Sequence, residues 1–127
     1  MELGADGIQA GTRFIATEEC DARDDYKQAF IRATAEDVTV IDSPVGMPGR
    51  VIRNRFVERM IHSGEEINFC YNYLKTCNPK TAKYCISQAL INAVKDDLDN
   101  KLIFCSARVN EIQKIQAVSE VITELLP

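Results

Sequence analysis

The sequence lacks several features that would place it in a specialised class of protein. It has no apolar run of about 18 residues, which a membrane-spanning helix needs. Its first residues have neither the basic nor the apolar stretch of a secretory signal. Its 15 Lys and Arg stand against 19 Asp and Glu, a net charge of −4 that does not attract nucleic acid. These absences predict a cytoplasmic protein with no nucleic-acid or membrane partner.

Short metal-binding motifs are also missing, although cysteine itself is not rare. The five cysteines are Cys20, Cys70, Cys77, Cys85 and Cys105. An odd number at uneven spacing does not suggest a disulfide framework. Six and seven residues separate Cys70 from Cys77 and Cys77 from Cys85, whereas most zinc and iron–sulfur sites contain a short Cys-x2-Cys unit. We therefore predict buried free thiols and no metal site.

Histidine and chain length set two further limits. The single histidine, His62, falls at the end of a predicted helix, where an imidazolium interacts favourably with the helix dipole. No base partner for it is evident, so we predict a surface role. The 127 residues suit one domain, but they are about half of the roughly 250 that a complete (β/α)8 barrel needs. No repeat or linker divides them.

Apolar spacing predicts that most of the chain is helical. The predicted helices are 22–34, about 50–62, one that follows Asn78-Pro79 with its apolar stripe over 82–94, and a closing helix with its stripe over 115–125. Asp21 is the expected N-cap of the first helix. Gly64 is the expected stop of the second.

Extended segments are predicted at three places. Gly7 to Gly11 is a short strand candidate, and Val38 to Ile41 is β-branched and ends before the strong loop signal of 43–49. Residues 101–105 fit either a strand or a buried extended piece, and residues 65–74 show no clear period.

The arginines of the second predicted helix have two interpretations. Arg50, Arg53, Arg55 and Arg59 could form a docking patch for phosphate or an acyl-carrier protein. A solvated face paired with Glu58, Glu65 and Glu66 is the commoner use of such charges, and we favour it.

The most informative segment is a predicted strand that ends in Gly11-Thr12. A glycine there lets backbone N–H groups approach a phosphate, and the threonine adds a hydroxyl donor. In (β/α)8 barrels a phosphate is often held by the loops after strands seven and eight. An ordinary turn is the alternative, because Gly-Thr after a strand is common.

A longer sequence pattern favours the phosphate site over an ordinary turn. Residues 4–19, GADGIQAGTRFIATEE, closely resemble the last barrel strand and following loop of nitronate monooxygenases, formerly called 2-nitropropane dioxygenases, and of the related flavin-type enoyl-acyl-carrier-protein reductases. The resemblance continues in Tyr26-Lys27-Gln28-Ala29, in residues 48–54 and in residues 84–90. It spans nearly the whole chain.

The resemblance implies an FMN cofactor and a fold. Gln9, Ala10, Gly11 and Thr12 would lie at the flavin phosphate, with Gly11 and Thr12 giving backbone and hydroxyl contacts. The implied fold class is α/β, as the C-terminal fragment of an FMN-binding (β/α)8 TIM barrel that is mostly helical on its own. Residues 1–17 would be the last strand and phosphate loop of this single partial domain, and residues 18–127 its post-barrel helical region.

The implied reaction is the oxidation of alkyl nitronates by flavin and dioxygen to a carbonyl compound and nitrite. The family's base and substrate-facing residues lie earlier in the barrel, so we assign no catalytic residue and expect the fragment alone to be inactive. A flavin-type enoyl-acyl-carrier-protein reductase is one alternative, although the segment from Cys70 to Cys85 looks more like the nitronate branch. A non-catalytic helical module that self-associates as a homo-oligomer is another.

Overall fold

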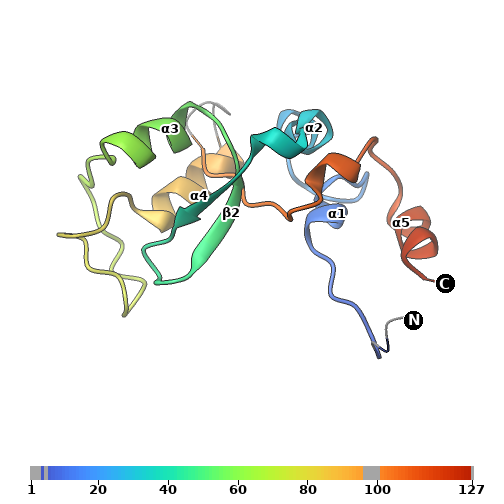
Figure 1. Cartoon of the computed structure of the whole chain (residues 1–127), viewed down its shortest axis with the longest axis horizontal. Coiled ribbons are helices and arrows are strands. Elements are labelled where there is room, and N and C mark those ends of the chain that lie inside the picture. Colours follow the sequence, from blue (N-terminus) through green and yellow to red (C-terminus); the bar gives the residue numbers. More distant parts are fainter. Residues whose placement is uncertain (1–3, 5, 96–100, 127) are drawn as a thin grey trace.

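The computed structural model describes residues 4, 6–95 and 101–126. The elements are α1 (Thr12–Ile15), α2 (Asp24–Arg32), the 3-10 helix η1 (Ala35–Asp37), β1 (Val38–Asp42), β2 (Pro48–Ile52), α3 (Arg55–His62), α4 (Ile86–Lys95), the 3-10 helix η3 (Val109–Glu111) and α5 (Val118–Leu125). The hairpin, α3 and α4 lie toward one end of the molecule, and α1 and α5 toward the other (Figure 1). No described helix is both long and apolar enough to cross a membrane.

The sheet consists of one antiparallel hairpin with a third segment alongside it. Val38 pairs with Ile52 and Asp42 with Pro48. The Ile52 N–H donates to the Ile103 carbonyl at 2.9 Å, and Val51 forms an isolated antiparallel bridge with Phe104. Of the two alternatives for residues 101–105, the structure shows an extended piece, buried over residues 101–103, that borders β2.

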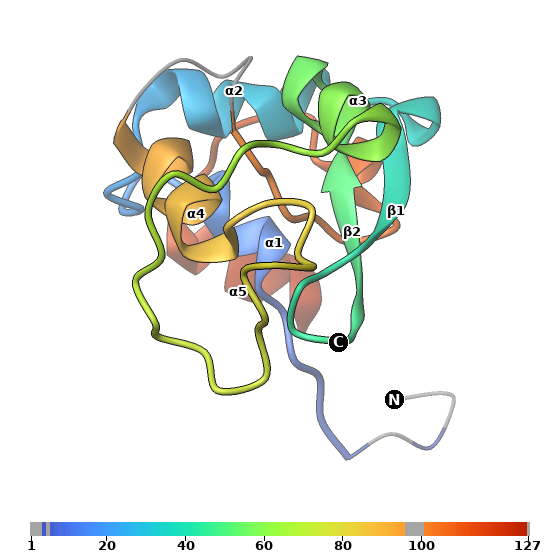
Figure 2. The same cartoon turned by 90° about the vertical axis from the view of Figure 1, so that its left-hand side faces the viewer.

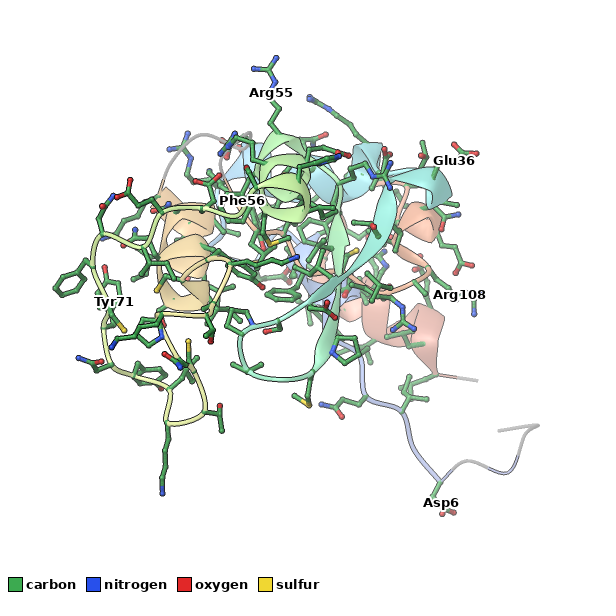
Figure 3. The ribbon with its side chains drawn as sticks, turned by 60° about the vertical axis from the view of Figure 1, so that its left-hand side comes forward. Asp6, Glu36, Arg55, Phe56, Tyr71 and Arg108 are labelled. Carbon is green, nitrogen blue, oxygen red and sulfur yellow. The ribbon has the colours of Figure 1, made fainter. Side chains whose placement is uncertain are left out.

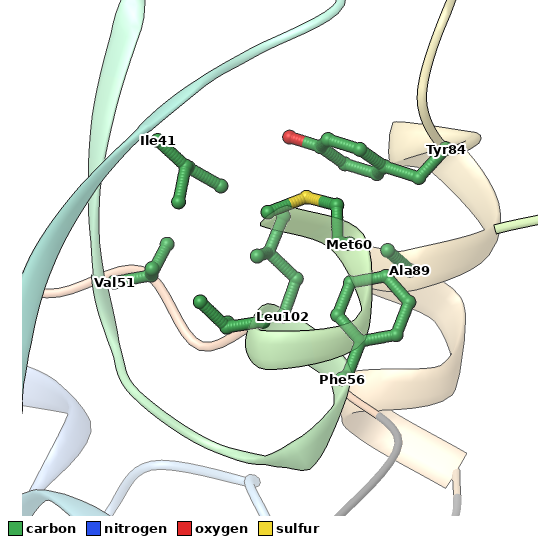
Figure 4. Close-up of a cluster of buried hydrophobic side chains, with 8 residues drawn as sticks. Ile41, Val51, Phe56, Met60, Tyr84, Ala89 and Leu102 are labelled. Carbon is green, nitrogen blue, oxygen red and sulfur yellow. The ribbon is translucent and has the colours of Figure 1, made fainter. Parts of the chain in front are cut away.

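Gly49 allows this close packing. A Cβ at this position would lie 2.6 Å from Cε1 of Phe104, which is well inside van der Waals contact. Phe104 packs against the hydrophobic cluster that Figure 4 shows. The ring therefore occupies the space that any larger residue at position 49 would need.

The predicted helix over about 50–62 is wrong in its first part. Residues 48–52 are β2, and the helix begins at Arg55 with Asn54 as its N-cap, whose side chain accepts the Val57 N–H at 2.9 Å. The pairing of β2 with β1 and with residues 103–105 outweighs local helical spacing. Gly64 follows the helix with φ of +75°, as expected of a residue at a helix stop.

The other helices are shorter than predicted. The helix expected over 22–34 covers Asp24–Arg32, and Arg23 rather than Asp21 holds the N-cap position. Asn78-Pro79 forms a turn instead of a helix start, since the Ala82 N–H donates to the Asn78 carbonyl at 2.9 Å. α4 begins only at Ile86. The strand at Val38 and the closing helix are confirmed.

Two hydrophobic clusters hold these elements together. One joins the hairpin, α3 and α4, with Val51, Phe56, Met60, Tyr84 and Leu102 among its buried side chains (Figure 4). The other joins α2 and η3 around Phe30 and Val109, both fully buried. Ile52 and Ile103 belong to the second cluster although their neighbours Val51 and Leu102 belong to the first, so the alternation of side chains along these extended segments connects the two.

Candidate functional site

The predicted strand from Gly7 to Gly11 is not a strand in this structure. These residues leave the body of the molecule as an extended segment beyond α1 (Figure 2), and Asp6 lies far from the rest of the chain (Figure 3). Among the described residues the sheet contains β1 and β2 alone. A strand requires a neighbour to bond its backbone groups, and segment 7–11 has no strand beside it here.

The four candidate site residues lie at the junction between this extended segment and α1. Gln9 and Gly11 are exposed, whereas Ala10 and Thr12 are half-buried. The Phe14 N–H donates to the Gly11 carbonyl at 3.0 Å, so Gly11 is the N-cap residue and Thr12 the first residue of α1. The structure thus keeps the four together but brings no second segment over them.

Gly11 is not required by packing within the described residues. Its φ is −124°, which any residue adopts, and a Cβ built on it would find nothing within 4 Å. One face of the Gly11 backbone is consequently open. A site in which backbone approaches a ligand needs such a face.

The chain immediately after this open face is anchored to α5. The Arg13 guanidinium donates to Oε1 of Gln116 and lies 3.5 Å from Oε2 of Glu124. Arg13 is next to the candidate phosphate segment in sequence, but its partners are Gln116 and Glu124. The hydrogen bond from Gln116 and then the Arg13 guanidinium lower the pKa of Glu124.

Two further contacts extend the anchor. Thr17 and Gln116 form a parallel bridge, in which the Glu18 N–H donates to the Gln116 carbonyl at 3.0 Å. The Glu19 carboxylate accepts the Val118 N–H at 2.9 Å, at the start of α5. Glu19 thereby serves as the cap that Ala117, the N-cap residue, cannot supply. No local pattern identified these partners, because Val118 and Glu19 are 99 residues apart.

The pocket next to the anchor carries charges of both signs. It has a volume of about 330 Å³, and Arg13, Ser106, Arg108, Glu111 and Glu124 are among its lining residues. Arg108 is paired with Glu111 at 2.6 Å. Since each arginine here has an acidic partner, the pocket presents no excess positive charge to a phosphate.

The arginines in and just before α3 form two of the predicted surface pairs. Arg59 lies 2.7 Å from Glu65 and Arg53 lies 3.4 Å from Glu58, with all four side chains substantially exposed. His62 is exposed as well, and its Nδ1 lies 2.8 Å from the Glu58 carbonyl. The surface interpretation is confirmed for these residues.

The cysteines are free, as predicted, but their predicted burial is wrong. All five are only half-buried. Burial raises the pKa of the Cys105 thiol. Within the part of the chain that the structure describes, no three His, Cys, Asp or Glu side chains are grouped so that they could hold a metal ion.

Comparison with known proteins assigns the family. The model of the family described as nitronate monooxygenase matches residues 1–127. The chain belongs to the nitronate monooxygenase family. The resemblance drawn from residues 4–19 is therefore confirmed. Within that stretch, residue 5 lies outside the residues that the structure describes.

Several nitronate monooxygenase relatives share part of their length with this chain. A probable nitronate monooxygenase from Staphylococcus saprophyticus is 32% identical over 101 residues, which are 80% of this chain and 24% of that protein. A probable nitronate monooxygenase from Staphylococcus haemolyticus is 45% identical over 58 residues, 46% of this chain and 16% of its own length. The chain therefore spans less than a quarter of these relatives.

Solved structures give the same picture for the fold. FabK from Thermotoga maritima aligns with 98% of the chain at a TM-score of 0.72 and 27% identity, and the match covers 37% of the FabK chain. Its M276A mutant aligns at a TM-score of 0.70 and 25% identity. The arrangement of helices and hairpin in this nitronate monooxygenase family member is thus that of about a third of FabK.

Proposed function

We propose that Gln9, Ala10, Gly11 and Thr12 form part of an FMN-phosphate site in an oxidoreductase of the nitronate monooxygenase type. Membership of the nitronate monooxygenase family supports an oxidoreductase activity. The open face of the Gly11 backbone supports the location of the phosphate site. Bound FMN would supply the redox chemistry that oxidises an alkyl nitronate with dioxygen to a carbonyl compound and nitrite. No residue of this chain is proposed as a catalytic base.

The four residues of the proposed site would have two different roles. Gly11 and Thr12 would offer backbone and hydroxyl donors to the phosphate, while Gln9 and Ala10 would position the extended segment that leads to them. The Arg13–Gln116–Glu124 contacts fix the downstream side. A phosphate would therefore meet a segment that is rigid on one side and free to adapt on the other.

The proposed fold is one part of a (β/α)8 barrel, with residues 1–17 as the last strand and phosphate loop and the remainder as the post-barrel region. In this proposal segment 7–11 becomes a strand only beside the neighbouring strands of a barrel, which explains its lack of partners here. We expect no turnover of nitronates by these 127 residues alone, and we expect the active protein to be cytoplasmic.

Gly11→Ala tests the phosphate site directly. Nothing lies within 4 Å of the added methyl group, so the thermal stability should be unchanged, whereas FMN affinity should fall because the Cβ obstructs the backbone. Gly7→Ala is the matched control, since its Cβ also finds nothing within 4 Å. The measurement is a titration of FMN followed by flavin fluorescence or absorbance. Equal affinity of both variants and the wild type would refute the proposed placement.

An alternative function is that of a flavin-type enoyl-acyl-carrier-protein reductase, which the likeness to FabK favours. Production of nitrite from an alkyl nitronate, measured against reduction of an enoyl thioester, separates the two activities. A third candidate is a non-catalytic module that self-associates through apolar side chains such as Leu90 and Val94, which are 44% and 68% exposed. Concentration-dependent sedimentation without FMN binding would favour that candidate.

A further inference from the structure

The irregular segment between α3 and α4 brings three thiols to one pocket. Cys70, Cys77 and Cys85 all line a pocket of about 240 Å³, together with Tyr71, Tyr73 and Lys75. All three cysteines are free and half-buried. They lie outside the segment proposed to hold a phosphate, and the sequence spacing alone had given no reason to expect a shared site.

The three thiols differ in how they are held. Cys85 directly precedes α4, and its carbonyl accepts the Ala89 N–H at 2.9 Å, so it is fixed to the first turn of that helix. Cys70 and Cys77 belong to the segment that makes a wide excursion from α3 and returns to α4 (Figure 2). Tyr71 marks this excursion in Figure 3. One thiol is thus on a regular element and two are on an irregular segment beside it.

The Cys70 sulfur takes part in a local turn. The Asn72 N–H donates to Cys70 Sγ at 3.4 Å, and the thiol lies 3.5 Å from Oδ1 of the same residue. Asn72 has a φ of +49°, a conformation that asparagine tolerates better than most residues. No helix or strand constrains residues 64–85, so the segment can move a thiol toward Cys85 without breaking a regular element.

Lys75 adds a positive charge to the lining of the pocket, which suits a reagent that carries carboxylates. Thiol–disulfide exchange requires accessible sulfurs and a second thiol close enough to resolve the mixed disulfide. Half-buried thiols that line one pocket meet the first requirement. Movement of the irregular segment that carries Cys70 and Cys77 toward Cys85 would meet the second. The three thiols have no structural role in the core, because none of them belongs to either hydrophobic cluster.

We propose that this pocket is a thiol–disulfide exchange site, in which an anionic low-molecular-weight disulfide oxidises Cys85 and one of the loop thiols, Cys70 or Cys77, to an intramolecular disulfide. In the first step one protein thiolate attacks the reagent's S–S bond, forms a mixed disulfide and releases one reagent thiol. In the second step the other protein thiolate attacks the protein sulfur of that mixed disulfide and releases the second reagent thiol. The protein loses two electrons and two protons, and the reagent is reduced to two thiols.

The proposal does not depend on FMN binding. A disulfide formed here would tie the irregular segment to the start of α4. Because exposed Lys75, Lys80 and Lys83 lie between the cysteines, a tryptic cut after Lys80 or Lys83 would then leave two fragments joined until a reductant is added. That behaviour distinguishes a cross-link from separate modification of each thiol.

The experiment treats the full chain with oxidised glutathione, digests it with trypsin and maps disulfides by mass spectrometry with and without reductant. We expect a cross-link between Cys85 and a loop thiol, with little retained glutathione. Cys85→Ser and the double variant Cys70→Ser/Cys77→Ser should each lose the cross-link and instead retain glutathione on the remaining pocket thiols. The control double variant Cys20→Ser/Cys105→Ser should form the cross-link as the wild type does, since neither residue lines the pocket.

Three results would overturn the proposal. The first is glutathione retained on the wild-type pocket thiols without a cross-link. The second is a cross-link that involves Cys20 or Cys105. The third is a chain whose pocket thiols react only after a chelator has removed a bound metal ion, because the thiols would then form a metal site. Circular dichroism of each variant checks that its fold is retained, and reversal of the cross-link by dithiothreitol checks that the wild-type reaction is redox chemistry.

Discussion

The chain on the two sides of Thr12 behaves in opposite ways. Downstream, Arg13, Thr17 and Glu19 each contact the region of α5 from the opposite end of the sequence. Upstream, residues 6–9 are exposed, and a Cβ at Gly7 or Gly11 would meet nothing. A short stretch of sequence thus includes both a firmly anchored and an unsupported part. The unsupported part is the one for which a cofactor role is proposed.

Contributions to stability and to the proposed function therefore come from different sides of Thr12. The anchored part obtains its contacts from within the described chain, so changes there should alter folding. The open part has few contacts to lose, so changes there should alter binding alone. Mutations on both sides of Thr12 can test this separation.

The largest expected effect comes from the core next to the anchored part. Phe30 is fully buried in the cluster of α2 and η3, so Phe30→Ala should cost about 3–5 kcal/mol. Ile8 is 55% exposed on the upstream side, and Ile8→Ala should change stability by less than about 0.5 kcal/mol. Urea unfolding followed by circular dichroism measures both, with Phe30→Leu as a milder substitute if the first variant does not fold. A comparable loss in Ile8→Ala would show that the upstream segment is packed after all.

A smaller loss of stability is expected when the contacts of Gln116 with Arg13 and Glu124 are removed. The buried Gln116 side chain accepts from Arg13 and donates to Glu124 at 2.7 Å, so Gln116→Ala should cost about 1–3 kcal/mol by leaving the guanidinium short of a partner. Gln9→Ala, on the exposed upstream side, should leave unfolding unchanged. If Gln116→Ala unfolds at the same urea concentration as the wild type, the Arg13 contacts do not support the fold.

The cap of α5 should contribute about 1 kcal/mol, because Glu19 accepts the N–H at the start of that helix. Glu19→Ala therefore lowers the unfolding temperature, whereas Glu18→Ala, which keeps its backbone bond to Gln116, should not. Differential scanning calorimetry of the two variants makes the comparison. Equal unfolding temperatures for the two would rule out the cap.

The smallest effect is a dependence on pH. Hydrogen bonds from Gln116 and Arg13 lower the pKa of Glu124 from its usual 4.5. A carboxylate with a lowered pKa in the folded state contributes stability above its unfolded pKa and loses it as the pH falls through the folded pKa. Stability of the wild type should thus fall more steeply below pH 4.5 than that of Glu124→Gln. Parallel curves, measured by urea unfolding across this range with Glu18→Gln as control, would contradict the prediction.

Local sequence signals located several elements but not their boundaries. The β-branched run at Val38 and the closing helix were predicted correctly because their signals are local. The prediction of a helix at residues 50–54 was wrong, because Val51 and Ile52 pair with segments that helical spacing does not reveal. Asn78-Pro79 was misinterpreted in a similar way: the side chain of Asn78 bonds the Lys80 N–H at 3.0 Å and closes a turn.

By itself, the sequence determined the family of this protein, because the resemblance lies in contiguous residues. The proposal of a phosphate site at Gln9, Ala10, Gly11 and Thr12 depends on contiguous residues in the same way. Only the tertiary structure revealed that Arg13 and Glu19 support α5, that Phe104 fills the space beside Gly49, and that Cys70, Cys77 and Cys85 share a pocket. The physical reason is that these arrangements join residues that are distant in sequence or depend on how an irregular segment turns, so no local pattern of hydrophobicity or charge encodes them.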